Sequence, residues 1–128
     1  MLLHRDATRT LARLGLTVPR THVVWLLHHR GPMTQRALAD ALEVTPRNVT
    51  GLVDGLVETG FVTREAHPAD RRAILVSLTE HGRSVLADMD RSHREAAAML
   101  FGGMPPESLE AFAEGLEHVL GRLQEELR

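Results

Sequence analysis

Cysteine is absent from this sequence. Its absence excludes disulfide bonds, thiolate metal ligands, cysteine redox sensing and a cysteine nucleophile together. No apolar run approaches the roughly 20 residues that a membrane-spanning helix needs, and no signal-peptide core precedes the first charged group, His4-Arg5-Asp6. We therefore expect a protein of the reducing cytoplasm with no membrane partner.

Lysine is absent as well, so all fifteen basic residues are arginine, which together with the alanine content suggests a GC-rich bacterial genome. The formal net charge of −2 is unevenly distributed. Residues 1–47 hold seven arginines against three acids, whereas residues 84–128 hold four arginines against nine acids. An acidic C-terminal part thus masks a basic N-terminal part, and the net charge does not exclude a nucleic-acid partner. Solvated helices at both ends would explain the same distribution.

The remaining composition is that of one globular domain, since 43% of the 128 residues are hydrophobic and 25% are charged. Apolar residues recur at helical spacing up to Gly60, a residue suited to end a helix. A short first helix is predicted from one apolar face, made of Leu3, Ala7, Leu11 and Leu14. Three further helices are expected to begin after a threonine N-cap: Thr17 before residues 18–29, Thr34 before 35–42, and Thr45 before 46–59.

After Gly60 the apolar period changes from about 3.6 to about 2. Residues 61–64 and 73–78 are β-type runs around a polar segment, which predicts a hairpin. A long helix is expected from Thr79-Glu80 to about Phe101, and a last one from Pro105-Pro106-Glu107 onward. The last helix carries a nearly heptad apolar seam that predicts pairing with a second copy, or packing on its own domain: Leu109, Phe112, Leu116, Val119, Leu123 and Leu127.

Two short helices joined at Glu43-Val44 and followed by a hairpin form the pattern of a helix-turn-helix with a wing. The amino-acid sequence of several segments, spread over nearly the whole chain, resembles that of the MarR family of bacterial transcription regulators. The segments that carry the resemblance are Leu16–Pro19, Met33–Ala39, Val44–Leu56, Glu58–Arg64 and, as the most diagnostic, Asp70–Gly82.

This resemblance implies a mainly α fold with a small β-hairpin, a winged helix-turn-helix with flanking dimerisation helices. Residues 17–82 would form the DNA-binding lobe, and residues 1–16 and 83–128 the dimerisation helices of a single MarR-like domain spanning 1–128. The implied function is a sequence-specific homodimeric regulator, typically a ligand-responsive repressor, on a pseudo-palindromic operator whose half-sites lie about one helical turn apart.

The recognition helix would present Thr45, Arg47, Asn48 and Thr50 to DNA from its first turns. Arginine can bind guanine with two hydrogen bonds and asparagine adenine, so Arg47 and Asn48 are the candidates for reading bases. The alternative is that they are exposed polar residues near an N-cap. We expect the apolar residues of this helix to face the core: Val49, Leu52, Val53, Leu56 and Val57.

The predicted wing carries Arg71 and Arg72, of which one would enter a narrow minor groove. Asp70 would repel phosphates, so we expect it to pair with an arginine and stiffen the hairpin. The predicted contacts to DNA also include Arg64 on the hairpin. The start of the third helix could hold phosphate oxygens through Thr34, Gln35 and Arg36.

Family members often bind small aromatic acids between the dimerisation helices and the DNA-binding lobe. The positions to test here are Arg20, as a carboxylate partner, with His22 and Trp25, although Trp25 could equally be core. The eight histidines show no metal-ligand spacing, so neither a metal nor a cofactor is expected.

The sequence departs from the family pattern at three positions. Glu43 stands where the helix-turn-helix turn usually has glycine, so the turn must be strained or altered. Gly51 and Gly55 each weaken the recognition helix by about 1 kcal/mol relative to alanine unless close packing compensates.

Two alternative functions are less consistent with the residues present. A winged-helix protein-interaction module is disfavoured by Arg47, Asn48, Arg71 and Arg72, and an enzyme by the lack of any nameable nucleophile, base and oxyanion set.

Overall fold

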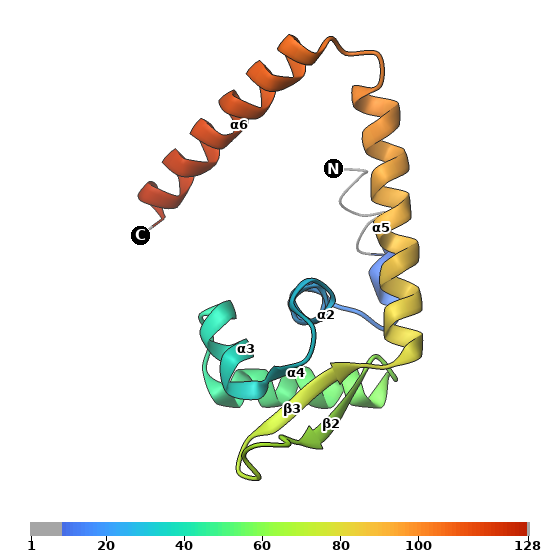
Figure 1. Ribbon diagram of the computed structural model, residues 1–128, viewed down its shortest axis with the longest axis vertical. Coiled ribbons are helices and arrows are strands. Elements are labelled where there is room, and N and C mark those ends of the chain that lie inside the picture. Colours follow the sequence, from blue (N-terminus) through green and yellow to red (C-terminus); the bar gives the residue numbers. More distant parts are fainter. Residues whose placement is uncertain (1–8, 128) are drawn as a thin grey trace. The chain divides into compact units, whose positions relative to one another are not determined.

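A computed structural model describes residues 9–127 of the chain, which form two units that divide between Met89 and Asp90. A short helical stretch at residues 9–13 comes first. Leu3 and Ala7 of the predicted first helix lie outside the described residues. The elements that follow are α2 (Val18–Arg30), β1 (Met33–Thr34), α3 (Gln35–Leu42), α4 (Pro46–Glu58), β2 (Val62–Ala66), β3 (Ile74–Leu78), α5 (Glu80–Phe101) and α6 (Pro106–Glu126) (Figure 1).

Threonine side chains cap four of these helices, which fixes where each one begins. Each hydroxyl oxygen accepts a hydrogen bond from a backbone N–H that has no partner inside the helix. The predicted starts of α2, α3 and α4 are therefore confirmed. The four caps are Thr17 to the Arg20 N–H (3.3 Å), Thr34 to Ala37 (3.0 Å), Thr45 to Asn48 (3.1 Å) and Thr79 to Gly82 (3.0 Å).

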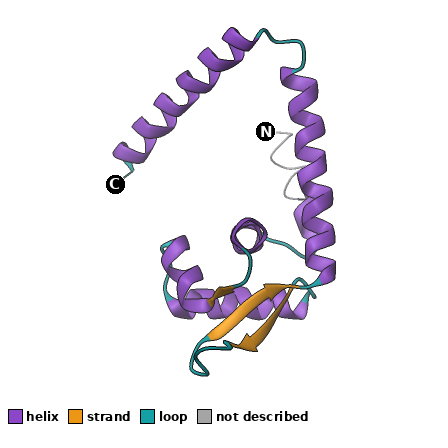
Figure 2. Ribbon diagram, in the orientation of Figure 1, coloured by secondary structure: helices purple, strands orange, loops and turns teal. Residues whose placement is uncertain are grey.

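The predicted hairpin is present, and a third strand extends it into a sheet of order β1-β3-β2 (Figure 2). β2 and β3 are antiparallel, with Val62 opposite Leu78 and Ala66 opposite Ile74. β1 pairs Met33 with Val76 on the other edge of β3. A strand of two residues shows no alternation in sequence, so β1 was missed. It anchors the start of α3 to the same strand that forms the wing.

The core of the first unit lies between α2, α4 and the sheet, because these elements contribute most of its buried side chains. Leu11 and Leu14 of the predicted first helix pack against it, half-buried. The expectation for α4 is confirmed at Val49, Val53 and Leu56 but wrong at Val57, which is 40% exposed beyond the edge of the buried face. The buried apolar residues are Leu16, Val23, Val24, Leu27, Leu38, Ala39, Val49, Val53, Leu56, Phe61, Val62, Val76 and Leu86.

Of the two outcomes expected for the turn between α3 and α4, a strained turn or an altered one, the structure has the strained one, with a left-handed residue. Glu43 lies at φ 55° and ψ 42°, in a region where side chains other than glycine are uncommon. The turn is held by backbone hydrogen bonds, including one of 3.1 Å from the Val44 N–H to the Ala39 carbonyl. A glutamate thus occupies this position at some backbone strain.

The second unit comprises the distal part of α5 and α6, joined by a turn in which Gly103 has φ 82°. Phe101 and Phe112 contact each other across this turn, with ring centroids 5.6 Å apart. None of the α6 side chains is buried. Among the described residues, no helix is both long and apolar enough to cross a bilayer.

Candidate nucleic-acid interface

The first turn of α4 presents an exposed polar surface made of Thr45, Arg47 and Asn48. The Thr45 hydroxyl accepts the capping bond, and the backbone N–H of Asn48 donates it. Within the described part of the chain, the side chains of Arg47 and Asn48 have no hydrogen-bond or ion-pair partner. They are therefore the predicted base-reading residues that the fold leaves available.

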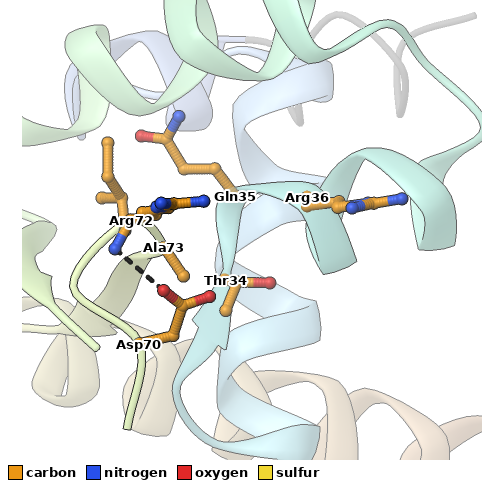
Figure 3. A pocket seen from close by; sticks show the side chains of 7 residues that line it. Thr34, Gln35, Arg36, Asp70, Arg72 and Ala73 are labelled. Carbon is orange, nitrogen blue, oxygen red and sulfur yellow. Dashed lines mark hydrogen bonds between the residues drawn. The ribbon is translucent and has the colours of Figure 1, made fainter. Parts of the chain in front are cut away.

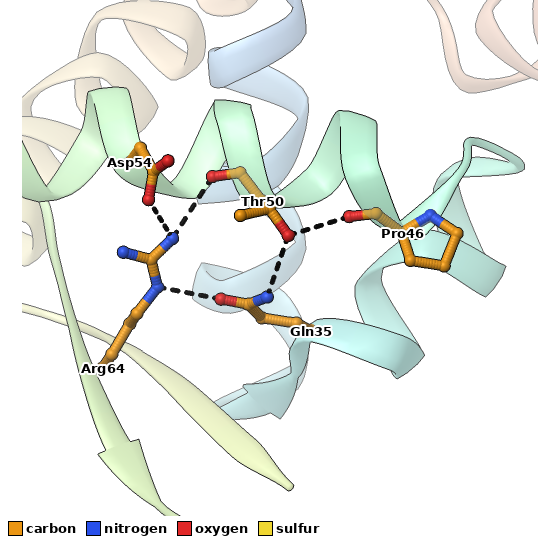
Figure 4. Close-up of polar contacts among 5 residues, drawn as sticks. All are labelled: Gln35, Pro46, Thr50, Asp54 and Arg64. Atoms are coloured by element: carbon orange, nitrogen blue, oxygen red, sulfur yellow. Dashed lines mark hydrogen bonds and ion pairs between the residues drawn. The ribbon is translucent and has the colours of Figure 1, made fainter.

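Arg64 has a different environment, because three elements meet at its guanidinium group (Figure 4). Its Nε donates to the Gln35 side-chain oxygen at 2.8 Å. Its Nη2 donates to the Thr50 carbonyl at 3.2 Å and forms an ion pair with the Asp54 carboxylate. The group thereby ties β2 to α3 and α4.

The side chains of Gln35 and Thr50 also form hydrogen bonds with other groups of the protein. The Gln35 amide donates to the Thr50 hydroxyl at 3.4 Å, and that hydroxyl donates to the Pro46 carbonyl at 3.0 Å. Three of the predicted DNA contacts, Gln35, Thr50 and Arg64, thus form one network that fixes the wing strand beside α4. Sequence reasoning assigned all three to DNA contact but missed that they bind one another. Their contact with DNA stays a prediction.

The turn of the wing is stabilised by Asp70, although not through the arginine side chain that we expected. Its Oδ1 accepts a hydrogen bond of 3.0 Å from the backbone N–H of Arg72. A second bond of 3.0 Å, from the Ala73 N–H to the Asp70 carbonyl, closes the turn. This local aspartate turn needs no guanidinium, and the side chains of Arg71 and Arg72 remain exposed.

A groove of about 470 Å³ lies between the start of α3 and the wing (Figure 3). Arg36 and Arg72 line it from opposite elements, beside the N-terminus of α3, whose free N–H groups favour anions. The structure thus brings together two predicted phosphate-contacting segments that lie far apart in sequence. The lining residues are Thr34, Gln35, Arg36, Asp70, Arg72, Ala73 and Ile74.

Arg20 is placed against the recognition helix rather than in an open pocket. It donates to the Gly15 carbonyl at 3.3 Å, and its guanidinium lies over Gly55, where an added Cβ would come within 2.3 Å of it. The glycine is thus explained by packing, as the sequence allowed. Its role as a carboxylate partner stays a prediction.

The other two proposed ligand-binding residues lie on α2. His22 is exposed, and Trp25 is half-buried against the core. Trp25 stacks on His29 with ring centroids 5.5 Å apart and an interplanar angle of 18°. A second groove of about 220 Å³ lies nearby, between the end of α2 and the start of α5, and includes His28 and Arg83 but not His22 or Trp25. The three proposed ligand contacts are therefore not gathered in either groove.

Comparison with known proteins identifies the family. A family model described as "MarR family" matches residues 16–74. The HTH-type transcriptional regulator YfiV of Bacillus subtilis (strain 168), itself uncharacterised, is 31% identical over 114 residues, which cover 88% of this chain and 70% of that protein. The chain belongs to the MarR family of transcriptional regulators. This assignment confirms the resemblance that the helix-turn-helix and wing segments suggested.

The other relatives differ in how much of their own length this chain matches. The HTH-type transcriptional repressor YetL, from the same organism, is 31% identical over 113 residues, which cover 85% of this chain and 66% of that protein. Further curated relatives are covered over only about half their length. Among solved structures, that of Streptococcus pneumoniae FabT in complex with DNA covers 99% of this chain and 95% of that one, with a TM-score of 0.76 and 21% identity. At that identity the likeness establishes the MarR fold alone.

Proposed function

We propose that this MarR family protein binds a pseudo-palindromic DNA operator as a homodimer and represses transcription. The observation that carries the proposal is the contrast between the arginines of the interface. Arg64 is bound to Gln35, Thr50 and Asp54, whereas Arg47 in the first turn of α4 is exposed without a protein partner among the described residues. The network holds the wing in place, and the available side chains stand where a recognition helix would meet base edges.

Sequence reading would come from Arg47 and Asn48. Both lie in the first helical turn, from which a recognition helix presents side chains to base edges. The arginine fork matches the two acceptors of guanine, and the asparagine amide matches the donor and acceptor of adenine. Thr45, whose hydroxyl already caps the helix, would add a contact to the DNA backbone.

Affinity without sequence preference would come from the wing and from α3. Arg71 and Arg72 stand exposed at the hairpin turn, where one guanidinium would enter the minor groove. In the groove at the N-terminus of α3, Arg36 and Arg72 would hold a backbone phosphate, since their two positive charges outweigh the Asp70 carboxylate that also lines it. These contacts release counterions and make binding depend on salt.

Dimerisation is supported by the apolar seam of α6, which the second unit by itself leaves exposed. The side chains of Phe112 and Leu123 are each 51% exposed. A contiguous exposed apolar patch of this kind is typical of a protein–protein contact. A two-fold dimer would double the recognition surface. The names of two similar proteins agree with the proposal, since YetL is a repressor and the FabT structure holds DNA.

An effector completes the proposal. A small aromatic acid could stack on the Trp25 ring beside His22, and its binding would shift the recognition helices to the wrong spacing. Arg20, which donates to the Gly15 carbonyl, would be the partner of its carboxylate. We propose a binding protein without catalytic activity, which acts in the cytoplasm, where bacterial DNA lies.

The test is a gel-shift titration of the full chain against the DNA that flanks its gene and against a random-sequence duplex. Arg47→Ala should lower the preference for the specific duplex by tenfold or more, on the order of the loss of one bidentate base contact. Arg72→Ala should reduce the slope of affinity against salt, and Arg122→Ala is a control with the same loss of charge on α6. If Arg72→Ala matches the parent in affinity and salt slope, the wing assignment is wrong. Equal affinity of the parent for both duplexes would contradict the proposed function.

A further inference from the structure

Two glycines stand one helical turn apart on α4, and the protein explains only one of them. Gly55 is buried, and a Cβ there would meet the Arg20 guanidinium at 2.3 Å. Gly51 is exposed, and a Cβ built on it meets nothing within 4 Å. A Cβ at residue 55 would therefore displace the Arg20 side chain, whereas a Cβ at residue 51 would meet open space.

Gly51 is nevertheless unfavourable for the helix that contains it. Glycine loses more backbone entropy on folding than alanine does, and in an exposed helix interior nothing offsets this loss. Its φ is not in the left-handed range, so no backbone conformation requires glycine here. Nothing in the described part of the chain therefore accounts for the missing side chain.

The position of Gly51 on α4 indicates where the reason for the missing side chain lies. A helical period of 3.6 residues puts it on the same face as Arg47, four residues before it, and Asp54, three residues after it. Both neighbours are exposed. The Thr50 hydroxyl is turned back to the Pro46 carbonyl. The centre of this face is therefore bare backbone between the free Arg47 side chain and the Arg64–Asp54 ion pair.

We propose that Gly51 is the point at which the backbone of α4 comes closest to the floor of the major groove, against the edge of a base pair. Glycine is used where a backbone must approach a ligand closely, because no Cβ holds the two apart. A side chain here would lift the helix away and lengthen the contacts of Arg47 and Asn48. Gly51 is thus a specificity-determining residue, an inference that depends on the proposed DNA-binding function.

The test uses Gly51→Ala and Gly51→Leu, with Gly121→Ala as the matched control. Gly121 lies in α6 away from the apolar seam and also has nothing within 4 Å. Both alanine variants should raise the melting temperature by about 2–6 °C, because alanine favours the helix. Only the Gly51 variants should lose affinity for a duplex selected with the parent protein from a random library. The loss should be about tenfold for alanine and larger for leucine.

The outcomes separate this inference from the proposed function. If the selected duplex has no consensus sequence, the proposed function fails, whatever the variants do. If the parent selects a consensus and Gly51→Ala binds it as tightly as the parent, the function stands and the inference is overturned. A lower melting temperature for Gly51→Ala would also overturn it, since glycine would then be required for folding. A graded loss of specific binding with unchanged affinity for a random duplex supports it.

Discussion

α4 and α6 are both amphipathic helices, yet only α4 buries its apolar face within its own unit. Val49, Val53 and Leu56 of α4 are fully buried, whereas every described side chain of α6 is exposed. The apolar patterns of the two helices are similar, but the burial of their apolar side chains is opposite. An apolar stripe indicates that a helix has a partner, but it does not say whether the same chain or another one supplies that partner.

The largest effect is expected from disrupting the exposed apolar seam of α6. Leu116→Glu places a charge in the apolar seam, where burial without a partner is costly. We expect the molecular mass in solution to fall from that of a dimer to that of a monomer. Operator affinity should fall by about 100-fold, because a monomer contacts only one half-site. Sedimentation equilibrium and gel-shift titration measure the two effects.

His118→Glu is the matched control for that experiment, because it adds the same carboxylate to the opposite side of α6. It should remain dimeric. An unchanged mass for Leu116→Glu would contradict the assignment of the seam as the dimer contact.

A second prediction compares the glycines of the two units. A Cβ at Gly82, in the first turn of α5, would lie 2.3 Å from the Phe61 carbonyl oxygen, which is backbone and cannot move aside. Gly82→Ala should lower the free energy of unfolding by about 3 kcal/mol. Urea denaturation gives the value, with Gly115→Ala in open space on α6 as the reference. Equal stability of the two variants would show that the junction of the wing and α5 is looser than described.

A third prediction concerns the start of the recognition helix. Thr45→Ala removes the oxygen that accepts the Asn48 N–H, and should cost about 1 kcal/mol of stability. Thr45→Ser retains the oxygen and should keep most of that stability. Thermal unfolding of the three proteins checks this, and a serine variant as unstable as the alanine variant would argue against capping.

The smallest effect is expected at the Arg64–Asp54 pair, which is partly open to solvent. A double-mutant cycle with Arg64→Ala and Asp54→Ala should give a coupling of about 0.5 kcal/mol, since exposed ion pairs contribute little. The same cycle measured in operator affinity tests the positioning role. Additive losses in affinity would mean that Arg64 acts on DNA directly and not by holding the wing.

Much of the interface could be predicted from the sequence because it depends on local signals. Thr34 and Thr45 each bond to an N–H three residues ahead, and Glu43 could be compared with the glycine usual in the family. The hydrogen bonds of Arg64 could not be predicted. Gln35 lies 29 residues from Arg64 in sequence, and no local sequence pattern indicates a contact between them. The packing of Arg20 on Gly55 was missed for the same reason.

The sequence by itself determined the family, the starts of the capped helices and the hairpin, because caps, turns and apolar periods act within a few residues. Tertiary structure alone decided which polar side chains are free and which are bound. Arg47 and Arg64 are both arginines on exposed segments, and only the meeting of β2, α3 and α4 distinguishes them. The physical reason is that a guanidinium binds whatever acceptors the fold brings within reach, and the fold places acceptors at Arg64 but not at Arg47.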